Sequence, residues 1–353
     1  MKQAFVAPAP PTGHRVAETQ GRLGFSVTLC LCSLWVLLLL WATTHAQGQA
    51  ALLPPRDVVA PAIPGVVAAG TRIELVKFPV QGTEGPVGLP DGSGIIFTET
   101  RADHITKVDA SGNTSTFVEK YNGSNGLGFD AKGRLISVQR APGNEKVGVL
   151  YPPGSEATLV DTFEGKPFNR LNDLVVSSKG GVYFTDTQGV YYLPPAGQVK
   201  KVIQGIKNPN GVLLSPDEKT AYANDKDGEY LLAFDVQPDG TLTSRRNFGK
   251  YKSLTVPGHK DPLLAEDNGA DGMAIDGEGR VYVATNLGVE VFSPRGDHLG
   301  VIPIGIWGGD QFMLRKPQNL TFSGPDKKTL YTVGANAIFK VRLLSQGFQG
   351  RAK

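Results

Sequence analysis

Six oxygen-bearing side chains recur at equivalent points of a repeated sequence pattern, each at the start of an apolar stretch. Neighbouring members are about 40–60 residues apart, a spacing typical of repeat architectures. The six residues are Glu84, Asn125, Asn172, Asn210, Asp271 and Asn319. Two carry carboxylates and four carry carboxamides, so the set offers oxygen donors with a charge of −2 and neither sulfur nor imidazole. Such donors suit a hard cation such as Ca²⁺ and do not suit zinc.

These residues also fit a simpler interpretation, because Asn-Gly and Asp-Gly pairs form turns and a strand often starts at a turn. For any single position the turn interpretation is sufficient. An oxygen donor at all six positions is harder to explain by turns alone, and Glu84 is a poor turn-forming residue. The repeat as a whole therefore favours a metal site.

The repeated unit consists of two predicted strands joined by a tight turn. In the clearest copy, Asp271–Asp276 is an apolar strand, Gly277–Arg280 is the turn and Val281–Ala284 is the second strand. Other copies begin at Gly85, Asn125, Asn172, Asn210 and Gln318. A strand-rich unit repeated in this way predicts an all-β, six-bladed β-propeller with four-stranded blades. Because the innermost strand of each blade lines the central channel, the oxygen-bearing residues should converge at one mouth of that channel.

Residues 1–46 have the composition of an export signal. A polar, basic start is followed by the uncharged apolar run Phe25–Ala42 and by the small residues Thr44 and Ala46, which suit a cleavage site. The run is only just long enough to span a bilayer, so we predict a signal peptide, with an uncleaved anchor helix as the alternative. Both place the propeller outside the cytoplasm: periplasmic, secreted, or attached to the membrane through this segment alone.

The rest of the chain divides into a linker, the propeller and a tail. Residues 47–70 are rich in Ala and Pro and are predicted to form an extended linker. The propeller is expected to span 71–345, and 346–353 are a tail. Thr71–Val80 is a predicted strand that completes the last blade and closes the ring. The long segment 252–267 is either a lid over a site or a surface insertion.

Charge and cysteine content exclude several classes of function. The formal net charge is +3 with no basic run, so no nucleic-acid partner is expected. Cys30 and Cys32 both lie in the N-terminal apolar run, so the propeller has no disulfide, thiol nucleophile or Cys-ligated zinc. No G-x-S-x-G motif is present. We expect a monomer that acts on a small molecule.

Four short motifs occur one per blade, in four of the predicted blades. They are Thr83-Glu84-Gly85-Pro86-Val87, Arg170-Leu171-Asn172-Asp173, Asn208-Pro209-Asn210-Gly211 and Ala270-Asp271-Gly272-Met273. In this order they resemble the SMP-30/gluconolactonase/LRE-like family of calcium-dependent six-bladed propellers. The resemblance extends over nearly the whole predicted propeller. Each motif is weak by itself, whereas the ordered set is specific.

The resemblance implies a role for each matched residue. The metal ligands would be Glu84, Asn172, Asn210 and Asp271, although in some family members the Asn172 position contacts the substrate instead. Asp271 would also be the general base, and Arg170 would bind the substrate. Asn125 is a further candidate for substrate contact, with a turn as its alternative role.

By the same resemblance, the activity would be gluconolactonase-like hydrolysis of sugar lactones. One divalent cation, Ca²⁺ with Zn²⁺, Mn²⁺ or Mg²⁺ as alternatives, would polarise the lactone carbonyl and activate the attacking water. Gly88 departs from the family pattern and opens the pocket wall, while Ala274 replaces the acidic residue of a second calcium site, so one metal is predicted. The alternatives are a phosphotriesterase similar to diisopropylfluorophosphatase and a non-catalytic, calcium-stabilised propeller that binds a ligand.

Overall fold

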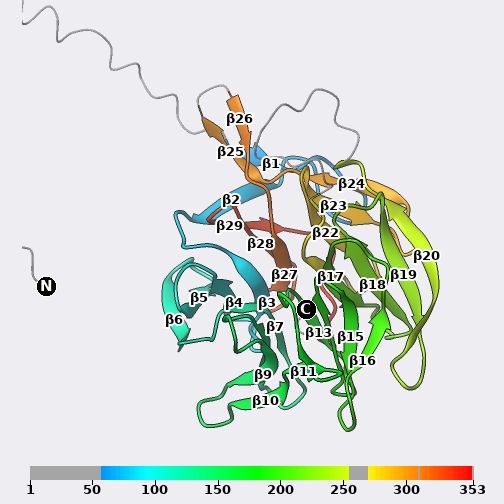
Figure 1. The fold of residues 1–353 in the computed structure, drawn as a ribbon. Coiled ribbons are helices and arrows are strands. Elements are labelled where there is room, and N and C mark those ends of the chain that lie inside the picture. Colours follow the sequence, from blue (N-terminus) through cyan, green and yellow to red (C-terminus); the bar gives the residue numbers. More distant parts are fainter. Residues whose placement is uncertain (1–56, 254–268, 309–310, 352–353) are drawn as a thin grey trace, which may run out of the picture. The chain divides into compact units, whose positions relative to one another are not determined.

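The computed structural model describes residues 57–253, 269–308 and 311–351. The predicted signal or anchor helix, the first part of the predicted linker and nearly all of 252–267 lie outside the described residues. The described ranges consist of strands and their connections (Figure 1) and contain no helix long and apolar enough to cross a membrane.

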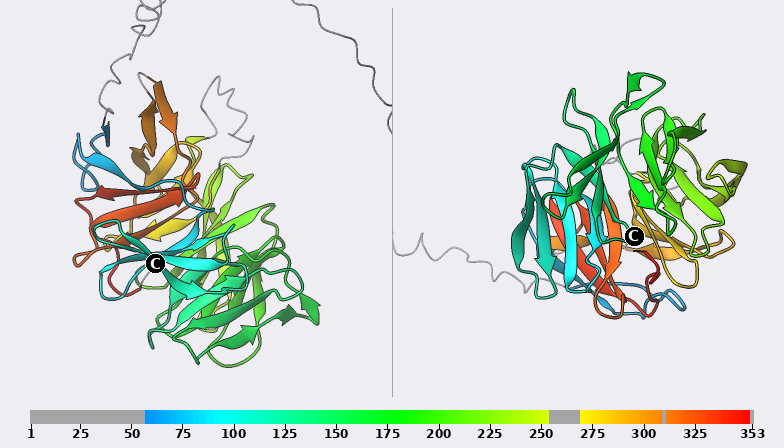
Figure 2. Two further views of the ribbon diagram at one scale, coloured as in Figure 1. Left: turned by 90° about the vertical axis from the view of Figure 1, so that its left-hand side faces the viewer. Right: turned by 90° about the horizontal axis from the view of Figure 1, so that it is seen from below.

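The strands form a ring of blades, and the first three follow one another directly along the chain (Figures 1 and 2). The first blade contains β3 (Glu84–Gly88), β4 (Gly94–Glu99), β5 (His104–Asp109) and β6 (Thr114–Glu119). The second contains β7 (Ser124–Phe129), β8 (Leu135–Gln139), β9 (Lys146–Tyr151) and β10 (Ala157–Val160). The third contains β13 (Leu174–Val176), β14 (Val182–Asp186), β15 (Gly189–Leu193) and β16 (Lys200–Ile203).

The remaining three blades complete the ring. The fourth contains β17 (Pro209–Leu214), β18 (Thr220–Asp225), β19 (Tyr230–Val236) and β20 (Leu242–Lys250). The fifth contains β21 (Met273–Ile275), β22 (Val281–Thr285), β23 (Gly288–Phe292) and β24 (His298–Ile302). The sixth combines β27 (Asn319–Ser323), β28 (Thr329–Gly334) and β29 (Ala337–Arg342) with β2 (Arg72–Lys77) and β1 (Val58–Val59). Two small hairpins lie between blades: β11 (Thr162–Phe163) with β12 (Lys166–Pro167), and β25 (Gly305–Gly308) with β26 (Gln311–Leu314).

The innermost strands contact one another in a closed circle. β3 contacts β7, and the contacts continue through β13, β17, β21 and β27 back to β3. All pairings within the blades are antiparallel, and five of the blades have four strands. This arrangement confirms the predicted six-bladed propeller.

Each interface between neighbouring blades has its own hydrophobic cluster. Val175 and Tyr183 of the third blade, for example, pack with Val212 and Leu214 of the fourth. Because a blade is covered on both faces, its second strand is buried along its whole length, as β4 is. This explains why such strands appear in the sequence as continuous apolar runs.

The ring is closed by an N-terminal strand, as predicted. β2 pairs with β29, and Ile73 lies opposite Val341. The prediction of an extended linker differs from the structure over its C-terminal part: Val58 pairs with Ile73 as part of edge strand β1, and Val66 and Val67 are buried in the sixth-blade cluster. Pro and Ala gave this stretch the composition of a linker, but Val58, Val66 and Val67 are buried against the last two blades.

The predicted tail packs across the ring at the end of the channel away from the starts of the inner strands. The C-terminal end lies near the middle of the ring in Figure 1. Lys327 of the sixth blade donates to the carbonyl oxygens of Phe348 (2.9 Å) and Arg351 (2.6 Å). Arg351 in turn binds Glu218 (3.0 Å) and the carbonyl oxygen of Leu214 in the fourth blade. The tail therefore links two blades that are not neighbours.

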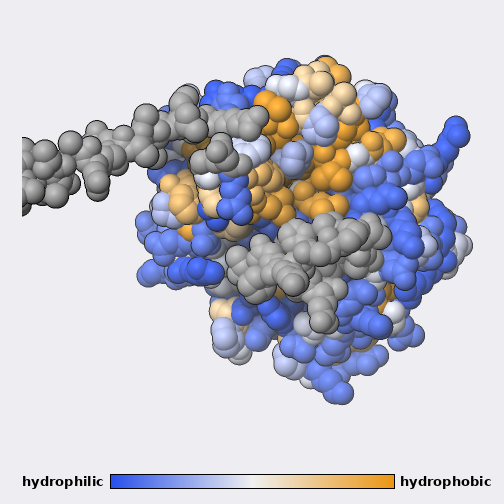
Figure 3. All heavy atoms as spheres, turned by 90° about the horizontal axis from the view of Figure 1, so that it is seen from above, coloured by the Kyte–Doolittle hydropathy of each residue, from blue (hydrophilic) through white to orange (hydrophobic). Residues whose placement is uncertain are grey.

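Apolar side chains reach the surface on the side of the ring that Figure 3 shows. In Figure 1 the elements at that side include β1, β24 and the β25–β26 hairpin. Their exposed apolar side chains are Val59, Leu299 and Met313. These three side chains are exposed to solvent and do not belong to the hydrophobic core of the last two blades.

We expect removal of residues 346–353 to lower the free energy of unfolding by about 2–5 kcal/mol, because it breaks several hydrogen bonds to charged groups and uncovers the far end of the channel. Urea unfolding followed by tryptophan fluorescence would measure this. A chain that lacks only residues 352 and 353 is the matched control and should unfold as the wild type does. Equal stability of all three proteins would contradict a structural role for the tail.

Candidate active site

Five of the six predicted oxygen-bearing residues meet at one mouth of the channel, each from a different blade. Asn125 donates from Nδ2 to the backbone oxygen (2.9 Å) and the Oδ1 (3.2 Å) of Asn172. The Asn210 side chain hydrogen bonds to Asp271, and the charge of Asp271 in turn acts on Glu84. Residues that are far apart in the sequence are thus within electrostatic or hydrogen-bonding reach.

In the sixth blade the mouth residue is Gln318, one position before the predicted Asn319. Gly272 donates its N–H to the Gln318 oxygen (2.8 Å), just as Gly126 donates to Asn172 (2.9 Å) in the equivalent place of the second blade. Asn319 lies one residue farther along the strand, and its Oδ1 accepts the N–H of the next residue at 2.9 Å. The repeat was therefore read one residue out of register in this blade.

A β-bulge turns the mouth residue out of the regular strand. In the first blade, Glu84 and Val87 on β3 face Thr98 and Ile96 on β4, so β3 has one residue more than its partner. β7 and β17 have the same irregularity at the corresponding place. Bulges re-aim side chains and are frequent beside active sites. The Asn-Gly pairs that resembled turns are therefore parts of bulged inner strands.

The glycine after the mouth residue is required by the next blade. A Cβ at Gly85 would lie 1.9 Å from the backbone oxygen of Asn125, and one at Gly211 would lie 2.4 Å from that of Asp271. Real side chains do not tolerate such contacts, so these positions accept glycine alone. The glycine that follows Glu84 and Asn210 in the repeat is therefore explained by the close packing of neighbouring inner strands.

In four blades the loop before the mouth residue is held by the side chain that ends the second strand, a feature that the sequence analysis missed. Glu99 accepts the N–H of Gln81 (2.7 Å), and Asp186 accepts the N–H of Asn169 (3.1 Å). The corresponding residues of the second and fourth blades are Gln139 and Asp225. A polar residue with an acceptor oxygen at the end of the second strand in these four blades was the signal available in the sequence.

Four buried oxygen atoms at the mouth have no hydrogen-bond partner within the described part of the chain. They are Glu84 Oε2, Asn125 Oδ1, Asn210 Oδ1 and Asp271 Oδ1. Buried polar atoms are nearly always satisfied, and each one left unpaired is unfavourable. Four unpaired oxygens from four blades form a donor set that fits a hard divalent cation. Three of them belong to residues predicted as ligands, whereas Oδ1 of the fourth predicted ligand, Asn172, accepts a hydrogen bond from Asn125.

Burial changes the protonation of the two mouth carboxylates. Desolvation, followed by the negative charge of Asp271, raises the pKa of Glu84 to about 8. Desolvation also raises the pKa of Asp271 to about 6, while Lys316 and Lys226 oppose this increase. A cation bound between these carboxylates would reverse the shifts, because it favours the charged forms.

Two charged residues of the mouth were not predicted. Asp173 is buried one position after Asn172, and its charge raises the pKa of both Glu84 and Asp271. Arg140 follows β8, and its charge lowers the pKa of Glu84. Neither residue occupies the mouth position of the repeat, so the repeat did not point to them.

Arg170 was predicted to bind substrate, and the structure places it at the mouth side of the third blade. Its neighbours Phe168 and Leu171 are buried, and Asn169 is held by Asp186. Arg170 itself has a φ of 54° and an exposed side chain. The loop therefore directs the guanidinium outward, two residues before Asn172.

The two histidines of the described ranges, His104 and His298, do not contribute to the mouth. His104 pairs with Glu99 (3.3 Å) and His298 with the fully buried Glu290 (3.0 Å), both in outer parts of their blades. Within 57–253, 269–308 and 311–351, no group of three or more His, Cys, Asp or Glu side chains is suited to a metal. The unpaired oxygens that the described residues offer to a cation are thus carboxamide oxygens beside carboxylates.

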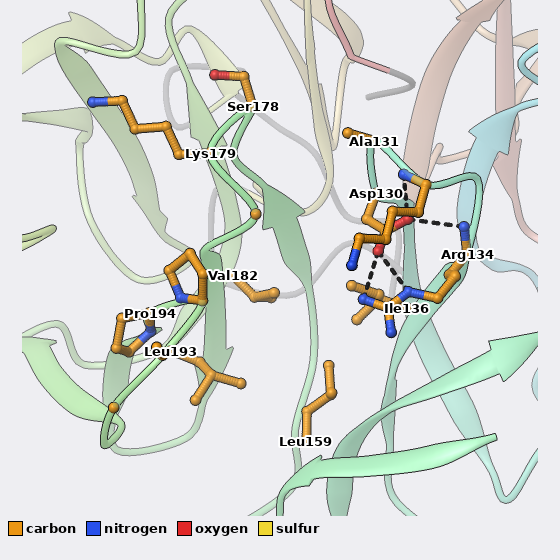
Figure 4. A pocket seen from close by; sticks show the side chains of 15 residues that line it. Asp130, Ala131, Arg134, Ile136, Leu159, Ser178, Lys179, Val182, Leu193 and Pro194 are labelled. Carbon is orange, nitrogen blue, oxygen red and sulfur yellow. Dashed lines mark hydrogen bonds and ion pairs between the residues drawn. The ribbon is translucent and has the colours of Figure 1, made fainter. Parts of the chain in front are cut away.

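A groove of about 480 Å³ lies elsewhere, between the second and third blades (Figure 4). Its lining includes Asp130, which pairs with Arg134 at 2.8 Å, and Ser178. Asp130 follows the C-terminal end of β7, whereas Asn125 lies near its start. The groove is thus at the far side of the ring from the mouth, and no predicted site residue lines it.

Comparison with known proteins agrees with this arrangement. A family model of the SMP-30/Gluconolactonase/LRE-like region matches residues 82–336. The gluconolactonase of Zymomonas mobilis is 28% identical over 278 residues, which is 69% of this chain and 75% of that protein.

Two solved structures share the fold. A gluconolactonase from Xanthomonas campestris has a TM-score of 0.66 and 24% identity, with 82% of this chain and 94% of that chain covered. Regucalcin from Agrobacterium tumefaciens, described as a calcium-binding protein, has a TM-score of 0.61 and 18% identity, with 77% and 94% covered.

The raised carboxyl pKa values predict how stability depends on pH without metal. A group whose folded-state pKa lies above the unfolded value stabilises the fold at low pH, and this contribution is lost as the pH rises through the folded value. With a chelator present, we expect the melting temperature to fall between about pH 5 and 8.5, as Asp271 and then Glu84 ionise.

Differential scanning calorimetry with chelator and with Ca²⁺ would test this expectation. Calcium should reduce the fall, and Glu84→Gln should remove its upper part. Glu119→Gln, which changes an exposed carboxylate on β6, is the matched control and should keep the wild-type profile. Identical profiles for Glu84→Gln and wild type would contradict the raised pKa.

Proposed function

Because this chain belongs to the SMP-30/gluconolactonase/LRE-like family, we propose that its propeller hydrolyses sugar lactones with one divalent cation at the channel mouth. The observation that carries the proposal is the set of four unpaired, buried oxygens from four blades. The gluconolactonase of Zymomonas mobilis supports the substrate class. The calcium-binding protein regucalcin from Agrobacterium tumefaciens, which shares the fold, supports Ca²⁺, with Zn²⁺, Mn²⁺ and Mg²⁺ as alternatives.

Glu84, Asn210 and Asp271 would hold the cation, together with Asn172 as implied by the family motif. When bound, the cation polarises the lactone carbonyl and stabilises the negative charge that develops on its oxygen. Asn125 contributes a fourth unpaired oxygen, so it is suited either to the cation or to a substrate hydroxyl.

Asp271 is the proposed general base. The family motif implies this role for it, and a carboxylate that holds the cation can accept a proton from the attacking water. It takes a proton from water as the water oxygen bonds to the carbonyl carbon. The bond from that carbon to the ring oxygen then breaks, and the ring oxygen receives the proton that Asp271 took, which regenerates the carboxylate. The product is the open-chain hydroxy acid.

Arg170 and Asn172 are the proposed substrate contacts. The guanidinium of Arg170 offers N–H donors at the exposed edge of the mouth, where the hydroxyls of a sugar lactone would lie. Asn172 is only partly exposed and lies deeper. This order leaves the carbonyl end of the lactone at the carboxylates and the polyhydroxyl end at Arg170.

We also propose that the protein acts outside the cytoplasm as a monomer. The proposal rests on the apolar run Phe25–Ala42 and the small residues that follow it. The periplasm, secretion and membrane attachment through this run are all compatible with it. Calcium is usually plentiful in such compartments.

The full chain should release protons from D-glucono-δ-lactone in a metal-dependent way. Turnover should vanish with a chelator and return when calcium is restored, because the carboxylates alone do not polarise the carbonyl. A pH-stat assay would measure it. No turnover with any of the four metals, while calcium still raises the melting temperature, would favour a non-catalytic, calcium-stabilised propeller.

Asp271→Asn should lower kcat by about 10²- to 10⁴-fold, because it removes the proton acceptor and keeps an oxygen donor. Calcium should still raise the melting temperature of this variant. Asn210→Asp is the matched control at a neighbouring mouth position. It replaces a carboxamide by a carboxylate, which is the opposite of the change in Asp271→Asn. A loss of kcat below about tenfold in Asp271→Asn would contradict its role as general base.

A further inference from the structure

In the described part of the chain, two guanidinium groups at the channel mouth have no acidic partner. Arg140 follows the end of β8 and donates its backbone N–H to Gly123 (3.2 Å), two residues before Asn125. Arg170 lies two residues before Asn172. Neither side chain makes a hydrogen bond or an ion pair in the structure as described over 57–253, 269–308 and 311–351. Arg140 begins the loop that follows β8 in the second blade, and Arg170 belongs to the loop that leads into Asn172 in the third.

Arg140 is unusual among the shielded arginines of the propeller. Arg280 is bound by Asp276 at 2.7 Å, and Arg351 is bound by Glu218 at 3.0 Å. Arg140 is only partly exposed, and desolvation lowers its pKa. A shielded guanidinium without an anion is unfavourable, because its charge is poorly hydrated and its donors are unpaired.

The charges around Arg140 indicate which kind of ligand would suit the mouth. Glu84 and Asp271 both act on it electrostatically, as does Arg170. With a divalent cation in place, the three carboxylates of the mouth, which include Asp173, are outweighed by the cation and the two guanidinium groups. The mouth then has a net positive charge beside the carbonyl site, and a neutral sugar lactone leaves that charge uncompensated.

We propose that Arg140 and Arg170 form an anion-binding subsite, so that the preferred lactone carries a carboxylate or a phosphate at the end remote from its carbonyl. Guanidinium groups bind both anions through paired N–H donors, and two of them from adjacent loops would hold one anionic group. This inference rests on the proposed lactonase function. It adds a specificity residue, Arg140, that lies outside all four family motifs.

Two matched pairs of lactones test the subsite in the full chain with calcium. D-Glucaro-1,4-lactone differs from D-glucono-1,4-lactone by a carboxylate, and 6-phospho-D-glucono-1,5-lactone differs from D-glucono-1,5-lactone by a phosphate. We expect kcat/KM to be at least about tenfold higher for the anionic member of at least one pair. The pair that shows the preference identifies the anionic group.

Arg140→Gln should remove that preference, mainly through KM, and should change the neutral lactones less than about threefold. Arg140→Lys should retain part of it, since it keeps the charge and loses the paired donors. Lys132→Gln is the matched control: it removes a positive charge from the same blade, at the far-side groove of Figure 4. It should have no effect.

Equal kcat/KM values within both pairs would overturn the proposal. So would an equal loss for neutral and anionic lactones in Arg140→Gln, because Arg140 would then support the mouth without selecting the substrate. If no lactone is turned over, the proposed function has failed and the subsite is tested by binding. D-Glucarate should then raise the melting temperature of wild type but not of Arg140→Gln, with D-glucitol as the neutral control. No stabilisation of wild type by D-glucarate would refute the subsite.

Discussion

The contact between neighbouring inner strands determines the geometry of the channel mouth. These strands approach so closely that a Cβ at Gly85 or Gly272 would lie 1.9 Å from an atom of the next blade. With glycine fixed at that point and a bulge beside it, the preceding side chain is directed to the rim of the channel. A glycine follows the mouth residue in four blades, whereas Asp173 and Asn319 take its place in the third and sixth. Side chains from separate blades are thus brought together at one rim of the channel.

This geometry brings carboxylates close together where they are buried, so their ionisation is unfavourable unless a cation is bound. Glu84, Asp271 and Asp173 are all buried; the charge of Asp271 raises the pKa of Glu84, and the charge of Asp173 raises the pKa of both Glu84 and Asp271. The hydrophobic clusters between the blades stabilise the fold and so offset this unfavourable electrostatic energy. They contribute no polar groups to the mouth. Stability and chemistry are therefore separated in space: the blade interfaces hold the ring, and the mouth is adapted to a ligand.

The sequence allowed the fold to be predicted because the repeat has a fixed period and because the blades are covered on both faces. It also located Glu84, Asn172, Asn210 and Asp271, since each lies at the repeated position. It failed at Gln318, because a bulge makes two consecutive residues equivalent candidates and pattern matching alone does not choose between them. Arg140 and Asp173 lie off the repeated position, so only the folded ring shows that they reach the mouth. The buried stretch 58–67 was mistaken for a linker because its cover comes from the opposite end of the chain.

The pairing of β2 with β29 also has a consequence for how this protein is made. Nearly the whole propeller is synthesised between these two partners, so β2 leaves the ribosome long before the strand that covers its edge. Pairing partners so distant in sequence are slow to find each other, because a long loop must be closed first. Until then an unpaired edge and an incomplete blade interface are available to other chains. Completion of the ring is therefore a late event. A chain that ends before its last blade keeps an unpaired edge on β2, which other chains can bind.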